Sequence, residues 1–135
     1  MRVSRPMSLL SSVLVVDDSD LQRAAAVELC RELGASVIHE AGDGAQALAV
    51  LANLKSPPAL ALVDLEMPVM NGIGFFEQMH ERQYRFPVII VSGQGSELIS
   101  AAKSLLDLMG VPCWGVVHKP ISAGALRELL PTADS

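Results

Sequence analysis

The sequence predicts an α/β domain built on a doubly wound, parallel, five-stranded sheet. First, short apolar runs alternate with longer segments of helical period, which is typical of parallel strands joined by right-handed crossovers. Second, the apolar runs are continuous rather than alternating, which indicates that helices cover both faces of the sheet. Third, the chain has 135 residues, of which 50% are hydrophobic, enough for one core and too few for two.

Five apolar runs are the predicted strands, and each ends at a turn or at a polar residue. The first is followed by Asp17 and the third by Asp64, while Pro87 introduces the fourth. The runs span residues 12–16, 36–40, 60–63, 88–91 and 113–117.

Five segments of helical period fill the intervals between and after these runs. The first begins at about Asp20, with Ser19 or Asp20 as its N-cap, and ends at Gly34. The other four contain residues 47–51, residues 75–79, residues 97–109 and a final stretch that ends near Leu130. We expect the buried face of the first helix to consist of Leu21, Ala24, Ala25, Leu29 and Leu33.

Composition and charge exclude several classes of function. Asp and Glu outnumber Lys and Arg by 15 to 10, which gives a net charge of −5, so we expect no direct binding of nucleic acid. The apolar runs are far shorter than the roughly 18 residues of a membrane span, and residues 1–10 do not resemble a signal peptide. Cys30 and Cys113 lack CxxC spacing and are expected to be packing residues. These features predict a cytoplasmic protein without a membrane partner.

Polar residues follow four of the predicted strands and should meet at one edge of the sheet. Asp17 and Asp18 follow the first strand, Asp64 the third, Ser92 the fourth and Lys119 the fifth. Doubly wound sheets bind ligands at the carboxyl ends of their strands. Converging carboxylates repel one another unless a cation lies among them, and Mg²⁺ prefers such oxygen ligands. The pattern predicts a magnesium site for phosphoryl chemistry, with the lysine and the serine as partners of phosphoryl oxygens.

Four segments in this order resemble the signatures of the receiver domain of two-component response regulators. These segments read VLVVDDS, ALVDLEMPVMNG, VIIVSG and HKPIS. The resemblance covers residues 12–130 and implies the flavodoxin-like receiver fold, with strand order 2-1-3-4-5. It places a receiver domain at residues 9–131, an N-terminal tail at 1–8, and a C-terminal tail or the start of a linker at 132–135.

The resemblance also implies a role for each residue of the site. Asp64 is the phosphoacceptor, and Ser92 and Lys119 match the hydroxyl and lysine positions of the family. Asp18 is a direct ligand of Mg²⁺, Asp17 acts largely through metal-bound water, and the backbone carbonyl of Glu66 is a further ligand.

Partners are implied in the same way. The phosphoryl group would come from a sensor histidine kinase or a phosphotransfer protein, and two copies would pair when phosphorylated. The domain would catalyse only its own phosphorylation and dephosphorylation, so the sequence predicts a signalling domain rather than an enzyme.

The chain departs from the family pattern in three places. Ser92 stands where threonine is commoner, and Val116 stands where many receivers carry a Tyr or Phe that moves on activation; Trp114 is a candidate for a related packing role. Ser92 and Lys119 are 27 positions apart, which predicts an extended fourth helix or following link. This extension resembles receivers fused to EAL-type cyclic-di-GMP phosphodiesterases and suggests a C-terminal effector of that kind.

Two alternatives remain open at this point. One is a receiver-like interaction module without switching, which the valine at position 116 favours. The other is a flavodoxin-like electron carrier, which shares the strand pattern. The carrier would need a phosphate cradle after the first strand, where the acidic segment 17–20 would repel the phosphate of FMN.

Overall fold

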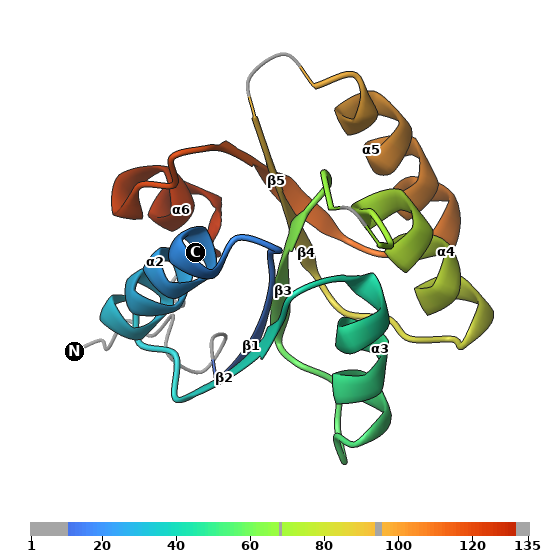
Figure 1. Ribbon diagram of the computed structural model, residues 1–135, viewed down its shortest axis with the longest axis horizontal. Coiled ribbons are helices and arrows are strands. Elements are labelled where there is room, and N and C mark those ends of the chain that lie inside the picture. The colour runs from blue at the N-terminus through green and yellow to red at the C-terminus, as the bar shows by residue number, and fades with distance from the viewer. Residues whose placement is uncertain (1–10, 68, 94–95, 132–135) are drawn as a thin grey trace.

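The computed structural model describes residues 11–67, 69–93 and 96–131, so the predicted tails at 1–8 and 132–135 lie outside the described residues. Five parallel strands form one sheet in the order β2-β1-β3-β4-β5, which confirms the predicted fold class (Figure 1). The strands are β1 (Ser12–Val16), β2 (Val37–Ala41), β3 (Leu60–Asp64), β4 (Val88–Ser92) and β5 (Cys113–His118). The helices are α2 (Asp20–Glu32), α3 (Gly44–Ala52), α4 (Gly72–Glu81), α5 (Leu98–Met109) and α6 (Ala123–Leu129).

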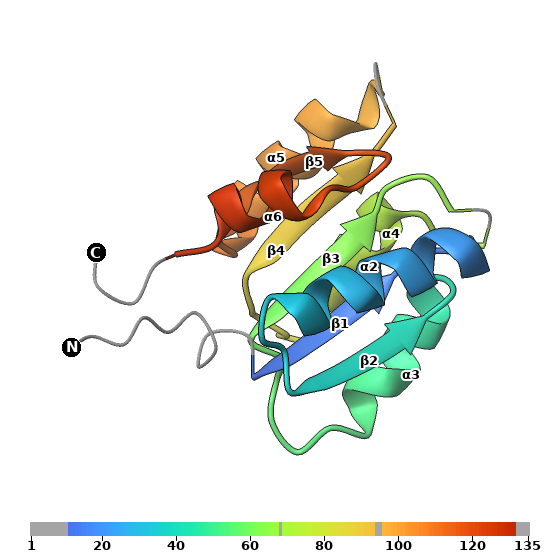
Figure 2. The same ribbon diagram turned by 90° about the vertical axis from the view of Figure 1, so that its left-hand side faces the viewer.

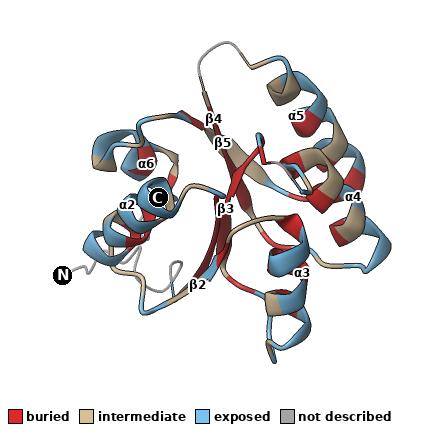
Figure 3. Ribbon diagram, viewed as in Figure 1, coloured by how far each residue is buried: buried red, intermediate tan, exposed pale blue. Residues whose placement is uncertain are grey.

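Helices cover both faces of the sheet, as the continuous apolar strands predict. Figures 1 and 2 show α2 and α6 on one face and α3, α4 and α5 on the other. The three inner strands are almost wholly buried, whereas the edge strands β2 and β5 are largely half-buried or exposed (Figure 3). Strand order reverses at β1, which pairs with both β2 and β3, and this switch point directs attention to the carboxyl ends of β1 and β3.

Side chains preceding four of the helices cap their first turns. Ser19 accepts the backbone N–H of Gln22 at the start of α2, which identifies it as the N-cap between the two predicted alternatives. Asp43, Asn71 and Ser122 cap α3, α4 and α6 in the same way. Among the described helices, none is long and apolar enough to cross a membrane.

The prediction for the buried face of α2 is wrong at Leu21, Ala24 and Ala25. Leu21 is 81% exposed, and Ala24 and Ala25 are exposed too, while Leu29 and Leu33 are only partly buried. The helix rests instead on a neighbouring stripe that packs against β1 and β3. Two apolar stripes overlap in this alanine-rich segment, and the sheet contacts the one made of smaller side chains. That stripe consists of Ala26, Val27 and Cys30.

Strand boundaries differ from the prediction by one residue in ways that matter for the site. β2 begins and ends one residue later than predicted, at Val37 and Ala41. β3, β4 and β5 each extend by one residue, to Asp64, Ser92 and His118. The acid and the serine of the predicted site are therefore terminal strand residues paired with neighbouring strands, which fixes their backbones.

β5 contains a bulge that the sequence does not reveal. Val88 pairs with Cys113 but Ile89 pairs with Gly115, so Trp114 is an extra residue without a partner on β4. Gly115 has φ of +146°, a conformation that L side chains rarely adopt. The bulge adds one position to the long stretch between Ser92 and Lys119.

The bulge determines which face each residue of β5 serves. Val116 packs against the core on the α3, α4 and α5 side, whereas Trp114 packs on the opposite side, with α6 and α2. The hypothesis that this tryptophan takes a packing role related to the aromatic switch is therefore wrong. It assumed regular alternation along the strand, which the extra residue breaks.

Candidate functional site

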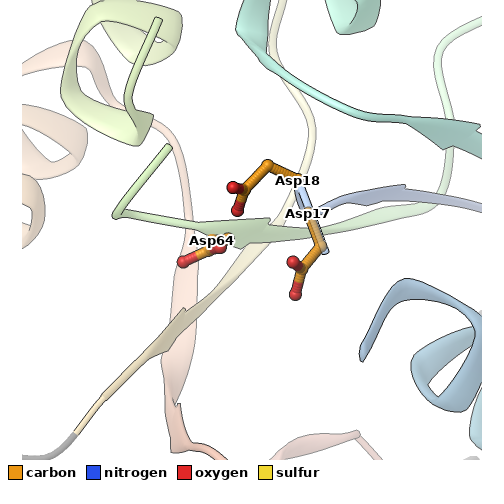
Figure 4. A group of neighbouring side chains, drawn as sticks. All are labelled: Asp17, Asp18 and Asp64. Carbon is orange, nitrogen blue, oxygen red and sulfur yellow. The ribbon is translucent and has the colours of Figure 1, made fainter. Parts of the chain in front are cut away.

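Three carboxylates gather at the carboxyl ends of β1 and β3 (Figure 4). Asp17 and Asp18 directly follow β1, and Asp64 ends β3. One carboxylate oxygen from each lies within 4.8 Å of the other two. The structure thus brings together the three acids that the sequence places at this edge.

Local hydrogen bonds orient two of these acids. The Asp17 carboxylate accepts the backbone N–H of Ser19 at 2.9 Å, and the backbone N–H of Asp17 donates to Ala41 on the neighbouring strand at 3.0 Å. The Asp64 carboxylate accepts the backbone N–H of Glu66 at 3.0 Å. Both acids are buried, while Asp18 is exposed. The site therefore combines two fixed acids with one that water can reach.

Lys119 provides the positive charge within the site. Its Nζ lies 2.9 Å from Oδ2 of Asp64 and 3.6 Å from Oδ2 of Asp17. Its backbone N–H donates to the carbonyl of Ser92 at 3.0 Å, which anchors the start of the β5–α6 loop against β4. Burial lowers the pKa of this lysine, but the hydrogen bond and charge of Asp64 raise it more, so the ammonium stays protonated.

Burial is the dominant influence on Asp64. It raises the pKa of this carboxyl group to about 6, against the lowering effects of Lys119 and the Glu66 N–H. A fully buried carboxylate with only one adjacent cation is short of positive charge at neutral pH. This shortage, together with three hard oxygen ligands in reach of one point, fits a divalent cation such as Mg²⁺.

Ser92 lies at the same edge, and its hydroxyl is bonded to a side chain of the protein. Its buried hydroxyl donates to the Glu66 side chain, at 3.0 Å to Oε2 and 3.3 Å to Oε1. Burial raises the pKa of Glu66, but hydrogen bonds with Ser96, Ser92 and the Gly93 N–H lower it by more. The pKa of this carboxyl group is therefore below its ordinary value. The sequence prediction assigned only the backbone carbonyl of Glu66 to the site and missed its carboxylate.

Sequence reasoning also missed Arg23, on the first turns of α2. Its guanidinium donates to the backbone carbonyl of Asp17 at 2.8 Å, to Asp20 at 2.7 Å and to Glu40 on β2 at 3.1 Å. The spacing of three residues between Asp20 and Arg23 on a helix is a sequence signal for one of these bonds. The contact to the carbonyl depends on the fold and fastens the segment that carries both acids.

A cavity of about 280 Å³ lies beside the carboxylates, between α2 and the loop after β5. Its walls include Asp17 and Lys119, together with Gln22, Ala25, Pro120 and Ile121. A reacting group that enters from this side meets one acid and the lysine of the site directly.

The fold and the acidic site are those of a signalling receiver. The family model of the response regulator receiver domain matches residues 13–131. The chain therefore belongs to the response regulator receiver family, and this domain takes up nearly the whole sequence.

Individual proteins show the same similarity. The autoinducer 1 sensor kinase/phosphatase LuxN of Vibrio campbellii is 31% identical over 119 residues, which cover 88% of this chain and 13% of that protein. The cyclic di-GMP phosphodiesterase RocR of Pseudomonas aeruginosa is 30% identical over 119 residues, covering 88% of this chain and 30% of that protein. The chain thus spans less than a third of either relative.

Solved structures agree with this result. A CheX-CheY-BeF3-Mg²⁺ complex from Borrelia burgdorferi aligns with a TM-score of 0.74 and 25% sequence identity. The alignment covers 87% of this chain and 84% of that one.

Proposed function

We propose that this receiver domain accepts a phosphoryl group on Asp64 from the phosphohistidine of a sensor histidine kinase or a phosphotransfer protein. The observation that carries the proposal is the setting of this carboxylate. It is wholly buried, bonded to Lys119 at 2.9 Å, and grouped with Asp17 and Asp18 within 4.8 Å. A structural ion pair would need one acid beside the lysine, whereas Lys119 lies beside both Asp64 and Asp17, and Asp18 adds a third carboxylate to the group.

In the transfer, a carboxylate oxygen of Asp64 attacks the phosphorus atom in line with the phosphorus–nitrogen bond of the donor. That bond breaks, its electron pair stays on the imidazole nitrogen, and an acyl phosphate forms on the aspartate. Lys119 then pairs with a phosphoryl oxygen in place of the free carboxylate. The Ser92 hydroxyl donates to a second phosphoryl oxygen.

The acidic group would hold Mg²⁺, with Asp18 and Asp64 as direct ligands, Asp17 further out, and the backbone carbonyl of Glu66 completing the protein ligands. The ion supplies positive charge that offsets the negative charge of the transferring phosphoryl oxygens. The buried carboxylates lack that compensation, since Lys119 is the one cation bonded to them among the described residues.

The comparisons support this proposal without fixing the output. The relative solved with BeF3 and Mg²⁺ is a receiver-like protein of the same fold. LuxN and RocR carry different activities in their names, so similarity to them favours no single effector. An EAL-type phosphodiesterase as C-terminal effector, and pairing of two phosphorylated copies, both remain predictions.

A receiver used only as an interaction module is the second candidate, because Val116 replaces the aromatic residue that many receivers move on activation. The flavodoxin-like carrier has less support, since Asp17 and Asp18 would repel the phosphate of FMN.

Labelling with a small phosphodonor tests the proposal. The wild type, incubated with acetyl phosphate and Mg²⁺, should gain one phosphoryl group by mass spectrometry, and Asp64→Asn should gain none. Asp20→Asn, which changes a neighbouring acid outside the carboxylate group, should label like the wild type. Equal labelling of the Asp64→Asn variant would place the phosphosite elsewhere, and no labelling of the wild type would favour the interaction module.

A further inference from the structure

The side chain of Glu66 accepts the hydrogen bond from the Ser92 hydroxyl, the group proposed above to donate to a phosphoryl oxygen. Ser92 is fully buried at the end of β4, and its hydroxyl donates to Oε2 of Glu66 at 3.0 Å and Oε1 at 3.3 Å. Glu66 lies two residues after the acceptor Asp64, and its backbone N–H bonds to the Asp64 carboxylate. One short segment therefore touches both halves of the site.

A serine hydroxyl has a single proton to donate, so it serves one anion at a time. Burial removes water as an alternative partner for Ser92. A bond from this hydroxyl to a phosphoryl oxygen therefore requires that the Glu66 carboxylate give it up. A phosphoryl group bonded to Ser92 would also repel the Glu66 carboxylate, since both are negatively charged.

We propose that Glu66 is a positioning residue that keeps the Ser92 hydroxyl engaged in the resting state and is displaced when Asp64 carries a phosphoryl group. This inference rests on the proposed function and specifies its regulation. Glu66 is exposed, so the released side chain can turn into water without losing a buried position. The same carboxylate is also stabilised by Ser96 and the Gly93 N–H, so its departure from Ser92 breaks its contacts with these two residues as well.

The proposal predicts that the resting contact opposes binding of a phosphoryl analogue. Beryllofluoride affinity, measured by titration calorimetry at fixed saturating Mg²⁺, should rise about tenfold in Glu66→Ala, the factor that matches one charge-assisted hydrogen bond. Glu66→Gln, which keeps the shape but not the charge, should show a smaller gain. Glu97→Gln removes an exposed acid at the start of α5 that makes no cap bond, and it should leave the affinity unchanged.

A double-mutant cycle separates this contact from a general effect of charge. If Glu66 acts through the Ser92 hydroxyl, Glu66→Ala should gain little or nothing in a Ser92→Ala background. An equal gain in both backgrounds, or no gain in the wild-type background, would overturn the assignment of Glu66 while leaving the phosphoacceptor role intact. A wild type that neither binds beryllofluoride nor labels with acetyl phosphate would instead overturn the proposed function, and the role of Glu66 with it.

Discussion

The two sides of the site, after β1 and after β4, are held by different kinds of contact. After β1, the Asp17 carboxylate is bonded to the Ser19 N–H, its backbone carbonyl to Arg23, and its second oxygen lies near Lys119. After β4, the Ser92 hydroxyl has the exposed Glu66 carboxylate as its partner. The first set joins the end of β1, the start of α2 and the loop after β5, whereas the second joins the segment after β3 to the end of β4.

This difference indicates a division of labour within one small site. The acidic side is built in advance, because the Ser19 N–H and the Arg23 guanidinium hold Asp17 through bonds that a phosphoryl group on Asp64 would not replace. On the hydroxyl side, Ser92 is bonded to the Glu66 carboxylate, and the incoming phosphoryl group is also an anion that accepts hydrogen bonds. The first side thus sets where Mg²⁺ and the phosphoryl group bind, and the second is the place where binding changes the structure.

The largest expected effect comes from Asp64, which stands between the two sides. Its pKa is raised from 3.8 in the unfolded chain to about 6 in the folded protein, so stability falls as pH rises through this window. Without Mg²⁺ at pH 7.5, Asp64→Asn should therefore be more stable than the wild type by about 3 kcal/mol in urea unfolding. The gain should shrink as pH falls toward 4. A destabilised Asn variant at pH 7.5 would mean that Lys119 fully compensates the buried charge.

The next effect concerns the response to metal. Mg²⁺ at a hundredfold excess over its dissociation constant should stabilise the wild type by about 2.7 kcal/mol. Asp18→Ala should abolish this shift without harming the fold, because it removes an exposed member of a repelling group. Thermal melts with and without Mg²⁺ measure both quantities, and Asp20→Ala should keep the shift. A full Mg²⁺ response in Asp18→Ala would show that the acidic side is not the metal site.

Removing the contacts of Arg23 on the acidic side should lower the free energy of unfolding by a smaller amount. Arg23→Ala removes a charged donor from the Asp17 carbonyl and from two acids, and we expect a loss of about 1–2 kcal/mol in urea unfolding. Mg²⁺ should also bind more weakly, because the segment that carries the acids is no longer fastened. Arg23→Lys, which retains the charge but not the forked geometry, should recover only part of both losses. Unchanged Mg²⁺ affinity would limit this arginine to a structural role.

The smallest effect on stability is expected on the hydroxyl side. Ser92→Ala should cost less than about 1 kcal/mol, since Glu66 is exposed and returns to water when its partner is removed. The same urea series used for Arg23→Ala gives a direct comparison. A larger loss in Ser92→Ala than in Arg23→Ala would reverse the proposed division between a fixed side and a changeable one.

Much of the fold could be predicted from the sequence because parallel strands buried on both faces carry a strong local signal. The runs at β1, β3 and β4 are continuous and apolar, and their ends were predicted to within one residue. The face of α2 was not predictable in the same way, because its alanines fit two adjacent stripes equally well. The bulge at Trp114 is likewise invisible, since it depends on how β5 pairs with β4.

The site, too, could be predicted only in part from the sequence. Sheet order brings Asp17, Asp18 and Asp64 together, so the position of each acid after its strand was sufficient to predict their grouping. The bond between Glu66 and Ser92 joins residues 26 positions apart through their side chains, and no periodicity encodes it. The contact of Arg23 with a backbone carbonyl was missed for the same reason. The positions of residues at strand ends predict which of them lie close together. They do not predict which hydrogen-bond donor pairs with which acceptor.

The bulge in β5 also determines what the protein can report optically. Trp114 is the single tryptophan of the chain, and it lies near the amino end of β5, roughly 13 Å along the strand from His118 at the site edge. Because it packs with α6 rather than among the carboxylates, its emission should follow the docking of that helix and the unfolding of the core. Quenching by a cation at the acidic edge should be weak. Intrinsic fluorescence is thus a probe of the α6 side of the sheet. An experiment that follows metal binding at the acidic edge needs a second fluorophore.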